Sequence, residues 1–320
     1  MEEESKGKIF PRLECMVIKD LENLTRFCLG NYIEFPSLKH LEIEQCPQFK
    51  AVILTNISTE SEGIQPFFNE KVALPSLEEM VISGMDNLKM IWNNQLPQQS
   101  LQKLKLMEIK NCDKLLTIFP SNMCERFWQL ESLTVTACGS LMEIFDLQRL
   151  NFGEKHSKAQ LKELCIHGLP KVTHVWKKEP QVMLSFPKLQ IVRVSGCKNL
   201  ENLFPASIAR NLFELKELEM VNCGVEEIVS KEDRANAAVR FVFPHVTFLK
   251  LSLLQRLRCF YPETHTSEWL VLKKLEVCDC DNVKIFTSKL LATRKLKSIN
   301  LMYSGTGPLL VEKVFPNLED

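Results

Sequence analysis

The sequence predicts an α/β-type solenoid, a horseshoe of about eleven repeats with a parallel β-sheet on its concave face and irregular or short helical segments on its convex side. Three observations predict this fold. One short phrase recurs along the chain, apolar and polar residues alternate after each copy, and a second apolar pair follows most copies at a fixed distance. The prediction assigns residues 9–320 to the repeat domain and residues 1–8 to an N-terminal extension.

The recurring phrase consists of an aromatic residue or Leu, then Pro, one further residue and a Leu. Residues 35–38, 74–77 and 186–189 are clear copies. We call the first Leu or Val of each repeat its anchor, and successive anchors lie 24 to 39 residues apart. Leucine-rich repeats run about 20–29 residues, so the longer spacings indicate inserted loops. The anchors are Leu13, Leu38, Leu77, Leu104, Leu130, Leu161, Leu189, Leu215, Val246, Leu272 and Leu296, and a truncated repeat occupies 315–320.

Each anchor is expected to precede a short strand. The residues three and five positions after the anchor are apolar in every repeat, from Met16 and Ile18 to Ile299 and Leu301. Residues two apart on a strand point to the same face of a sheet, so this pair is expected to face the core. A single repeat cannot bury such a face, and the strands are therefore expected to stack in parallel.

The convex side is expected to be closed by a second apolar pair, near eleven and fourteen positions after the anchor. Leu115 and Ile118 are one example. The segments 53–73, 146–158 and 230–242 account for the long spacings. They are polar and charged, so we expect them to be mobile surface loops. The exposed repeats at the two ends are expected to fray or to associate.

Six of the twelve cysteines lie eight positions after an anchor: Cys46, Cys112, Cys138, Cys197, Cys223 and Cys280. A metal site, disulfides between neighbours such as Cys112 and Cys138, and a ladder of small buried side chains could each explain this pattern. The ladder is favoured, because leucine-rich repeats place Asn or Cys at this position and no CxxC pair occurs. Other repeats carry a larger apolar residue there, which produces a super-repeat of three units.

Motif and composition searches exclude several function classes. No P-loop, GxGxxG, HExxH or GxSxG pattern occurs, so no catalytic, cofactor-binding or metal-binding residues are predicted. Lys+Arg and Asp+Glu both number 40, and this neutrality argues against nucleic acid as a partner. No apolar run approaches the roughly 18 residues of a membrane span, and no export signal opens the sequence. A cytoplasmic or nuclear location is expected.

The exposed side of the predicted sheet is the candidate binding surface. Residues two, four, six and seven positions after each anchor should line it, and most of them are polar. Apolar residues on an exposed strand often mark a binding site, and Leu106 and Phe248 are the strongest candidates. The full set of candidate protein-binding residues is His40, Glu42, Val81, Leu106, Glu108, Thr134, His167, Ile191, Arg193, Glu217, Val221, Phe248, Lys250 and Lys274.

The full phrase, Phe-Pro-x-Leu-x-x-Leu-x-Ile-x-x-Cys-x-x-Leu-x-x-Ile-Phe, resembles the C-terminal leucine-rich repeats of plant coiled-coil nucleotide-binding disease resistance proteins. The alternation of Cys-type units with units such as Gly168–Pro170 and Val175–Trp176 is similar to that group, and so is the Ile118–Ser121 continuation. The resemblance covers about residues 9–303. It implies that the chain senses a pathogen effector or a guarded host protein. It also implies that the chain holds a nucleotide-binding module inactive, in cis or in trans.

Two other binding roles and a stand-alone role remain open. Substrate-recognition repeats of an F-box-type ubiquitin ligase also contain cysteine, but the Phe-Pro opening does not suit that class. Repeats of the ribonuclease-inhibitor type have more regular lengths than these. A repeat protein that acts alone, as a decoy or adaptor, is the third alternative. Non-enzymatic protein recognition is common to all of them.

Overall fold

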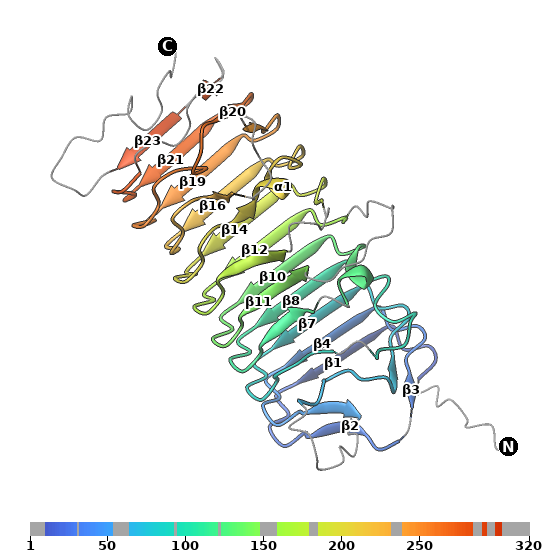
Figure 1. Ribbon diagram of the computed structural model, residues 1–320. Helices are drawn as coiled ribbons and strands as arrows, with labels where there is room; N and C mark the ends of the chain where they lie inside the picture. Colours follow the sequence, from blue (N-terminus) through green and yellow to red (C-terminus); the bar gives the residue numbers. More distant parts are fainter. Residues whose placement is uncertain are drawn as a thin grey trace.

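The computed structural model describes residues 10–30, 32–53, 64–92, 95–120, 123–147, 159–178, 185–231, 239–283, 290–292 and 298–302. In the described residues, a parallel sheet of 11 strands runs along one face of the solenoid, from residues 15–19 at one end to residues 298–302 at the other (Figure 1). Every strand begins two residues after an anchor and ends six after it, which confirms the predicted repeat register. The strands are β1 (Cys15–Lys19), β4 (His40–Glu44), β7 (Glu79–Ser83), β8 (Leu106–Lys110), β10 (Ser132–Thr136), β12 (Glu163–His167), β14 (Ile191–Ser195), β16 (Glu217–Val221), β19 (Phe248–Ser252), β21 (Lys274–Cys278) and β23 (Ser298–Met302).

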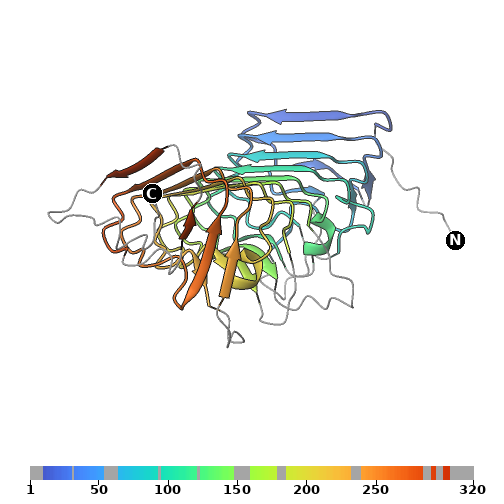
Figure 2. The same cartoon turned by 90° about the horizontal axis from the view of Figure 1, so that it is seen from above.

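Shorter strands pair on the opposite face, across the core from the long sheet (Figure 2). Several of these strands contain the last member of the second apolar pair of a repeat, as Ile118 is in the pair Leu115 and Ile118, which are both fully buried. The strands are β2 (Arg26–Cys28), β3 (Ile33–Glu34), β5 (Ala51–Ile53), β6 (Val72–Ala73), β9 (Thr117–Phe119), β11 (Glu143–Leu147), β13 (His174–Lys178), β15 (Phe204–Pro205), β17 (Val229–Ser230), β18 (Val239–Val242), β20 (His265–Trp269) and β22 (Leu290–Ala292).

Among the described residues, two helical turns lie on this opposite face at the same phase of the super-repeat. The 3₁₀ turn η1 (Cys124–Phe127) follows Phe119 and Pro120, and α1 (Ala206–Ala209) follows Phe204 and Pro205. Pro fixes its own backbone and favours the start of a helical turn. The matching sequences therefore produce matching turns.

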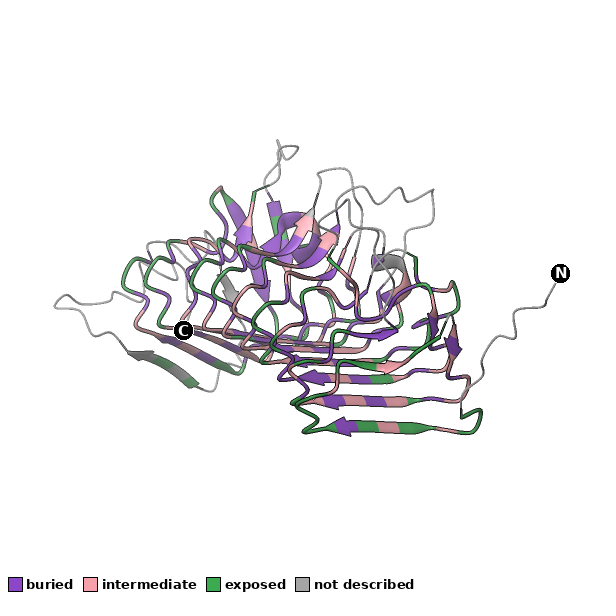
Figure 3. Ribbon diagram, turned by 90° about the horizontal axis from the view of Figure 1, so that it is seen from below, coloured by how far each residue is buried: buried purple, intermediate pink, exposed green. Residues whose placement is uncertain are grey.

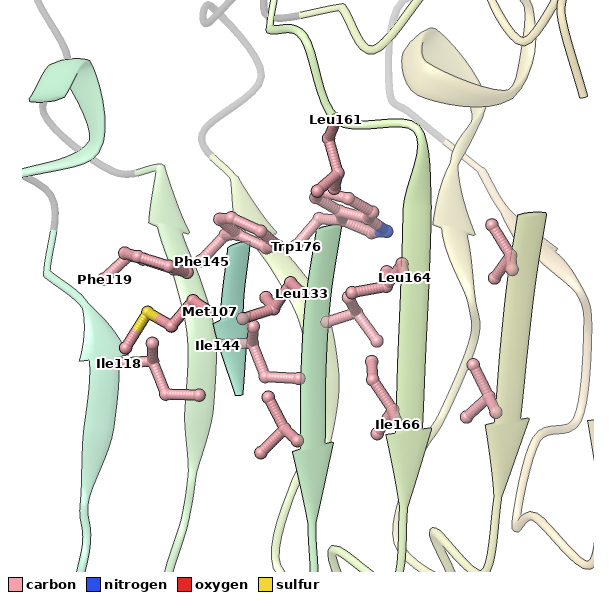
Figure 4. Packing of buried hydrophobic residues seen from close by; sticks show 14 of the residues in the cluster. Met107, Ile118, Phe119, Leu133, Ile144, Phe145, Leu161, Leu164, Ile166 and Trp176 are labelled. Atoms are coloured by element: carbon pink, nitrogen blue, oxygen red, sulfur yellow. The ribbon is translucent and has the colours of Figure 1, made fainter. Parts of the chain in front are cut away.

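The middle of the core contains a row of stacked aromatic rings that the sequence analysis did not predict. Its members lie fifteen positions after their anchors: Trp92, Phe119, Phe145 and Trp176. Phe119 stacks on Phe145 at 5.0 Å between ring centroids, and Phe145 stacks on Trp176 at 4.8 Å. Figure 4 shows Phe119, Phe145 and Trp176 side by side, with the aliphatic side chains of the core beneath them. Aromatic pairs in such geometry contribute more than their buried area alone.

Parts of two long segments that we expected to be mobile loops are buried, so that expectation was wrong for them. In segment 53–73, Phe67 and Phe68 pack edge to face at 4.9 Å and are almost fully buried. In segment 230–242, Phe241 in β18 is 0% exposed. These aromatic residues bury enough apolar surface to hold their segments in the core. Residues 54–63, 148–158 and 232–238 lie outside the described part of the chain.

A left-handed residue ends the sheet strand in ten repeats. The backbone angle φ at the seventh position after the anchor is positive in each, and the N–H of this residue donates to the last carbonyl of the next strand in nine. Gly, Asn and Asp tolerate this conformation best. They occupy seven of the positions, and Gln45, Ala137 and Leu253 occupy the others.

We expect Ala137→Gly to stabilise the protein by about 0.5–1 kcal/mol. The left-handed strain of Ala is relieved, and part of that gain is offset by the greater freedom of Gly in the unfolded chain. The reverse substitution at the same position of its repeat, Gly168→Ala, should destabilise the protein by a similar amount. The added Cβ would meet no atom closer than 3.8 Å, so the loss comes from the backbone angle φ of +64° at Gly168 and not from a steric clash. Urea denaturation measures both. Equal shifts in the same direction would contradict the assignment of strain to this position.

The six cysteines of the repeat position form the predicted ladder of buried, unbridged thiols. Each is at most 4% exposed, and each thiol donates to the carbonyl two residues earlier, as Cys46 does to Glu44 at 3.3 Å. The pKa of the Cys112 thiol is raised by its hydrogen bond with the neighbouring Cys138 and by burial. The thiol thus takes the place of the Asn found in other leucine-rich repeats and forms a hydrogen bond with a backbone carbonyl of the turn.

Thiol alkylation of the native protein should therefore modify Cys15, which is exposed, and leave the six ladder cysteines unmodified. The reagent has to reach the thiol, and burial of all six ladder cysteines prevents this in the native protein. Mass spectrometry of alkylated peptides, before and after addition of guanidinium, measures the two groups. Labelling of Cys112 as fast as Cys15 in the native state would contradict the ladder.

Candidate protein-interaction surface

The side chains two, four and six positions after each anchor form three parallel rows on the outer side of the long sheet, which we call the sheet face. The strand register fixes these rows, since residue two of one strand pairs with residue two of the next. All fourteen predicted binding residues lie in the three rows. His167 and Lys274 are exposed, and the other twelve are half-buried.

Arg193 organises the middle of the sheet face. Its guanidinium binds both carboxylate oxygens of Glu217 on the next strand, at 3.0 Å each, and contacts Glu163 on the preceding strand at 3.1 Å. Two-point binding of a carboxylate is the geometry for which guanidinium is best suited. The hydrogen bond with Glu217 raises the pKa of Arg193, so the side chain stays charged. Three strands are thereby linked through one cation.

The N-terminal part of the sheet face is rich in carboxylates. Nδ1 of His40 lies 3.0 Å from Glu79, and Nε2 lies 3.9 Å from Glu42. Lys19 contacts Glu42 at 2.9 Å and Glu44 at 3.1 Å, and the hydrogen bond with Glu42 is the main cause of its raised pKa. Lys110 pairs with Glu108 on the same strand. Acidic groups thus outnumber basic ones here.

The C-terminal part of the sheet face has a different composition. Lys250 donates to Glu219 at 2.7 Å, and Lys274 pairs with Glu276 at 2.6 Å. The Lys274 ammonium also lies 4.9 Å from the ring centre of Phe248, a cation–π distance. The aromatic ring of Phe248 is half-buried and is held on one side by this cation. Phe248 is therefore a well-positioned apolar contact for a partner.

The apolar candidates do not form one patch. Leu106 lies on β8 and Phe248 on β19, with β10, β12, β14 and β16 between them. Ile191 lies between Glu163 and Glu217 in its row, and these two carboxylates both bind Arg193. Leu106 and Phe248 are therefore separate apolar contacts, each of which stays a candidate for binding. The sheet face instead alternates single apolar side chains with ion pairs.

A groove that the sequence analysis missed lies at the turns that follow the sheet strands. Its volume is about 580 Å³, and its lining is Thr173, Asn199, Glu201, Asn202, Glu226, Glu227 and Arg256. Burial raises the pKa of the Glu227 carboxyl, with a smaller contribution from Glu226. The hydrogen bond from Arg256 lowers the pKa of Glu226. Most of these residues follow their anchors by ten or twelve positions, where polar side chains are usual in this chain, so no distinct signal marked the groove in the sequence.

The described residues contain no group of three or more His, Cys, Asp or Glu side chains placed to hold a metal ion. Within the same residues, no helix has the length and apolar character needed to cross a membrane. The sheet face provides a broad surface on which ion pairs alternate with single apolar side chains.

Comparison with known protein families identifies a relationship for this chain. The model of the family described as plant disease resistance protein RPS2-like, leucine-rich repeats, matches residues 1–139 and 76–224. The two matched ranges overlap, and together they cover more than half of the chain. No curated protein and no solved structure matched.

Proposed function

Because this chain belongs to the leucine-rich repeat family of plant RPS2-like disease resistance proteins, we propose that its sheet face recognises a pathogen effector or a guarded host protein and also holds a nucleotide-binding module inactive. Membership of this family supports a repeat domain that mediates protein interactions in plant immunity. Effector sensing and autoinhibition are the two specific roles that we add. The site of action that we propose is the cytoplasm or the nucleus.

The dimensions of the sheet face support a protein as the partner. Its rows cross 11 strands, and strands are about 4.8 Å apart, so each row is about 50 Å long. A specific protein–protein interface buries about 800 Å² on each partner, which such a surface can supply, whereas a small ligand would contact only a few strands. The mixture of both charge signs fits protein recognition better than nucleic-acid recognition.

The ion pairs on the sheet face support a role in specificity. Glu163, Arg193 and Glu217 are fixed by one another, so a partner meets them in one arrangement and does not have to order them first. Complementary charges then select the partner and exclude others, and the apolar contacts Leu106 and Phe248 add buried area. No covalent step is required in this chain.

Autoinhibition follows if the nucleotide-binding module and the sensed protein compete for the same face. An effector that binds the sheet face more tightly displaces the module, and the displacement is limited by the difference between the two affinities. The observation that carries this proposal is the single continuous sheet face, which offers both ligands the same rows of side chains.

Expression in leaves together with a nucleotide-binding module from a receptor of this family tests the proposal. The wild-type chain should suppress the cell death that the module alone causes. The double substitution Arg193→Glu with Lys250→Glu should abolish suppression at equal protein level, because it reverses two sheet-face charges. The matched control is Lys171→Glu with Arg210→Glu, which changes the net charge equally at two exposed residues off the sheet face.

Equal suppression by both double variants would contradict a role for the sheet face. The double variant places new carboxylates beside Glu217 and Glu219, which lowers stability, but the effect is small because the Arg193 side chain is 41% exposed and Glu217 25% exposed. Ion pairs of this exposure are worth about 0–1 kcal/mol. Before the leaf assay, the melting temperatures of the two double variants are compared with that of the wild-type chain. A fluorescent fusion of the chain, viewed in the same leaves, tests the proposed location.

A further inference from the structure

The groove at the turns lies where one repeat is shorter than its two neighbours. The turn after β16 has only Gly224 between the ladder position and the next buried apolar residue, whereas the turns on both sides have two residues there. Gly224 is buried, and its N–H donates to the Cys197 carbonyl at 3.0 Å. The missing position carries Asn199 in the preceding repeat and Arg256 in the following one. Two repeats, or about 10 Å at the usual strand spacing, therefore separate these two side chains across the groove.

Backbone hydrogen bonds between adjacent repeats fix the floor of the groove. The N–H of Glu201 donates to the Thr173 carbonyl at 3.0 Å, and the N–H of Glu226 donates to the Glu201 carbonyl at 3.2 Å. Asn202 and Glu227 directly follow two of these residues, so they occupy neighbouring places in adjacent repeats. Figure 3 shows exposed and intermediate residues at the turns beyond the arrowheads of the sheet strands, so the groove is open to solvent.

Two of the three carboxylates in the groove have charged or titratable partners. Arg256 forms an ion pair with Glu226, and Arg258 contacts the same carboxylate at 3.3 Å. Nε2 of His174 lies 3.4 Å from Glu201. With the histidine neutral, three carboxylates and two guanidinium groups leave one negative charge in excess.

The third carboxylate, that of Glu227, has no such partner. Among the described residues, no side chain donates a hydrogen bond to it. Burial raises its pKa, with a smaller contribution from the charge of Glu226, and neither arginine opposes this rise. The amide side chains of Asn199 and Asn202 line the same groove and have no hydrogen-bond partner in the part of the chain that the structure describes. One carboxylate and two amides are thus available to a ligand.

The chemistry of these three side chains selects among ligand classes. A guanidinium group carries one positive charge and five N–H donors in a plane, and it binds a carboxylate through two parallel hydrogen bonds. Its remaining donors match amide oxygens beside the carboxylate. An ammonium group is a compact point charge that cannot make this two-point contact. A sugar would bond to the amides but would leave the charge of Glu227 unbalanced.

We propose that this groove binds a guanidinium group. Glu227 forms the two-point contact, and the amide oxygens of Asn199 and Asn202 accept from the outer N–H groups. The guanidinium belongs either to an arginine side chain of another polypeptide or to a small molecule. The proposal does not rest on the function proposed for the sheet face, because the groove lies on the turns and uses none of the sheet-face residues.

Two probes test the proposal, methylguanidinium and the capped peptide acetyl-Gly-Arg-Gly-amide. Saturation-transfer NMR of each probe, titrated against the full chain, measures its affinity. We expect saturable binding with a Kd of about 1 to 10 mM, as suits one charged contact in an open groove. Glu227→Gln should weaken binding at least about tenfold, because Gln keeps the shape of the side chain but lacks the charge. A peptide with citrulline in place of arginine should bind as weakly to the wild-type chain.

The matched control is Glu70→Gln, which removes an exposed carboxylate that does not line the groove. It changes the net charge equally and should alter the affinity less than about twofold. The melting temperature of Glu227→Gln should equal or exceed that of wild type. The raised pKa of Glu227 means that folding disfavours its ionised form, and a neutral side chain removes this cost. Unfolding would then not explain a loss of binding.

The two probes also distinguish the sources of the guanidinium. Binding of the peptide at least about fivefold more tightly than methylguanidinium assigns the groove to an arginine side chain, and equal or tighter binding of methylguanidinium assigns it to a small molecule. Three results would overturn the proposal: no saturable binding of either probe, equal affinity of the arginine and citrulline peptides, or equal affinity of the Glu227→Gln and wild-type chains.

Discussion

Gly224→Ala should destabilise the protein by more than about 3 kcal/mol, because the added methyl group has no space in a well-packed structure. A Cβ at Gly224 would lie 1.8 Å from the carbonyl oxygen of Lys198 and 2.7 Å from its carbonyl carbon. These are backbone atoms of the preceding repeat, so no side-chain rotation can relieve the clash. The N–H of Gly224 also donates to the Cys197 carbonyl at 3.0 Å, and separation of the two turns would lose that bond.

The cause of this close approach can be read in the sequence. Most Cys-type repeats have two residues between the cysteine and the next buried apolar residue, as in Cys197–Leu200. The repeat of Leu215 has one fewer, since Val225 follows Gly224 directly and is fully buried. The shortened turn draws the backbone against Lys198, and only a residue without a Cβ fits there.

Two substitutions control for the general effect of Gly→Ala. Gly139 lies nine positions after its anchor, as Gly224 does, but its added Cβ would meet the flexible carboxylate of Asp113 at 3.1 Å. We expect Gly139→Ala to cost about 1 kcal/mol at most. Gly30 has no atom within 4 Å of the added Cβ, so Gly30→Ala should be nearly neutral. Guanidinium denaturation of the three variants measures the order, and a loss at Gly224 no larger than at Gly139 would contradict the packing argument.

Phe119→Ala should destabilise the protein by about 3–5 kcal/mol, the usual cost of removing a buried aromatic side chain. Phe119 is 0% exposed and lies at the centre of the aromatic row, with Phe127 at 4.5 Å and Phe145 at 5.0 Å between ring centroids. Its loss would leave a cavity that the strands on both faces cannot close without moving. The central repeats would then separate from each other more easily than the end repeats do.

Phe213→Ala is the control, because the Phe213 side chain is 49% exposed. It should change the free energy of unfolding by less than about 1 kcal/mol. Guanidinium denaturation followed by tryptophan fluorescence measures both variants, and Trp92 and Trp176 of the same row contribute to the signal. Similar losses for Phe119→Ala and Phe213→Ala would show that the row does not hold the central repeats together.

The strand register could be predicted because it depends on local periodicity alone. The apolar pair three and five positions after the anchor specifies which side of each strand is buried, and a shift of one residue would expose every such pair. The cysteine ladder could be predicted for the same reason, since its members share one phase of the repeat. The fourteen candidate residues lie on the sheet face because that face is the other side of the same strands.

Other features depend on which side chains meet across repeats, and no single repeat contains that information. Phe119 and Phe145 were visible only as residues of irregular segments, although a search fifteen positions after each anchor would have found them. The Arg193 cluster needed three strands in register to be recognised. Burial of Phe67 and Phe241 contradicted the expectation from segment polarity, because two or three aromatic side chains outweigh many polar ones in apolar area.

Carboxyl labelling of the chain, alone and in complex with the nucleotide-binding module used in the leaf assay, tests the proposed sheet-face interface most directly. A carbodiimide with a glycine ester modifies accessible carboxylates, and mass spectrometry measures the extent at each residue. We predict that the complex protects Glu42, Glu108 and Glu217 on the sheet face, while Glu201 and Glu226 of the groove are labelled as in the free chain. Protection of the two groove residues, with unchanged labelling of the three sheet-face residues, would contradict the assignment of recognition to the sheet face.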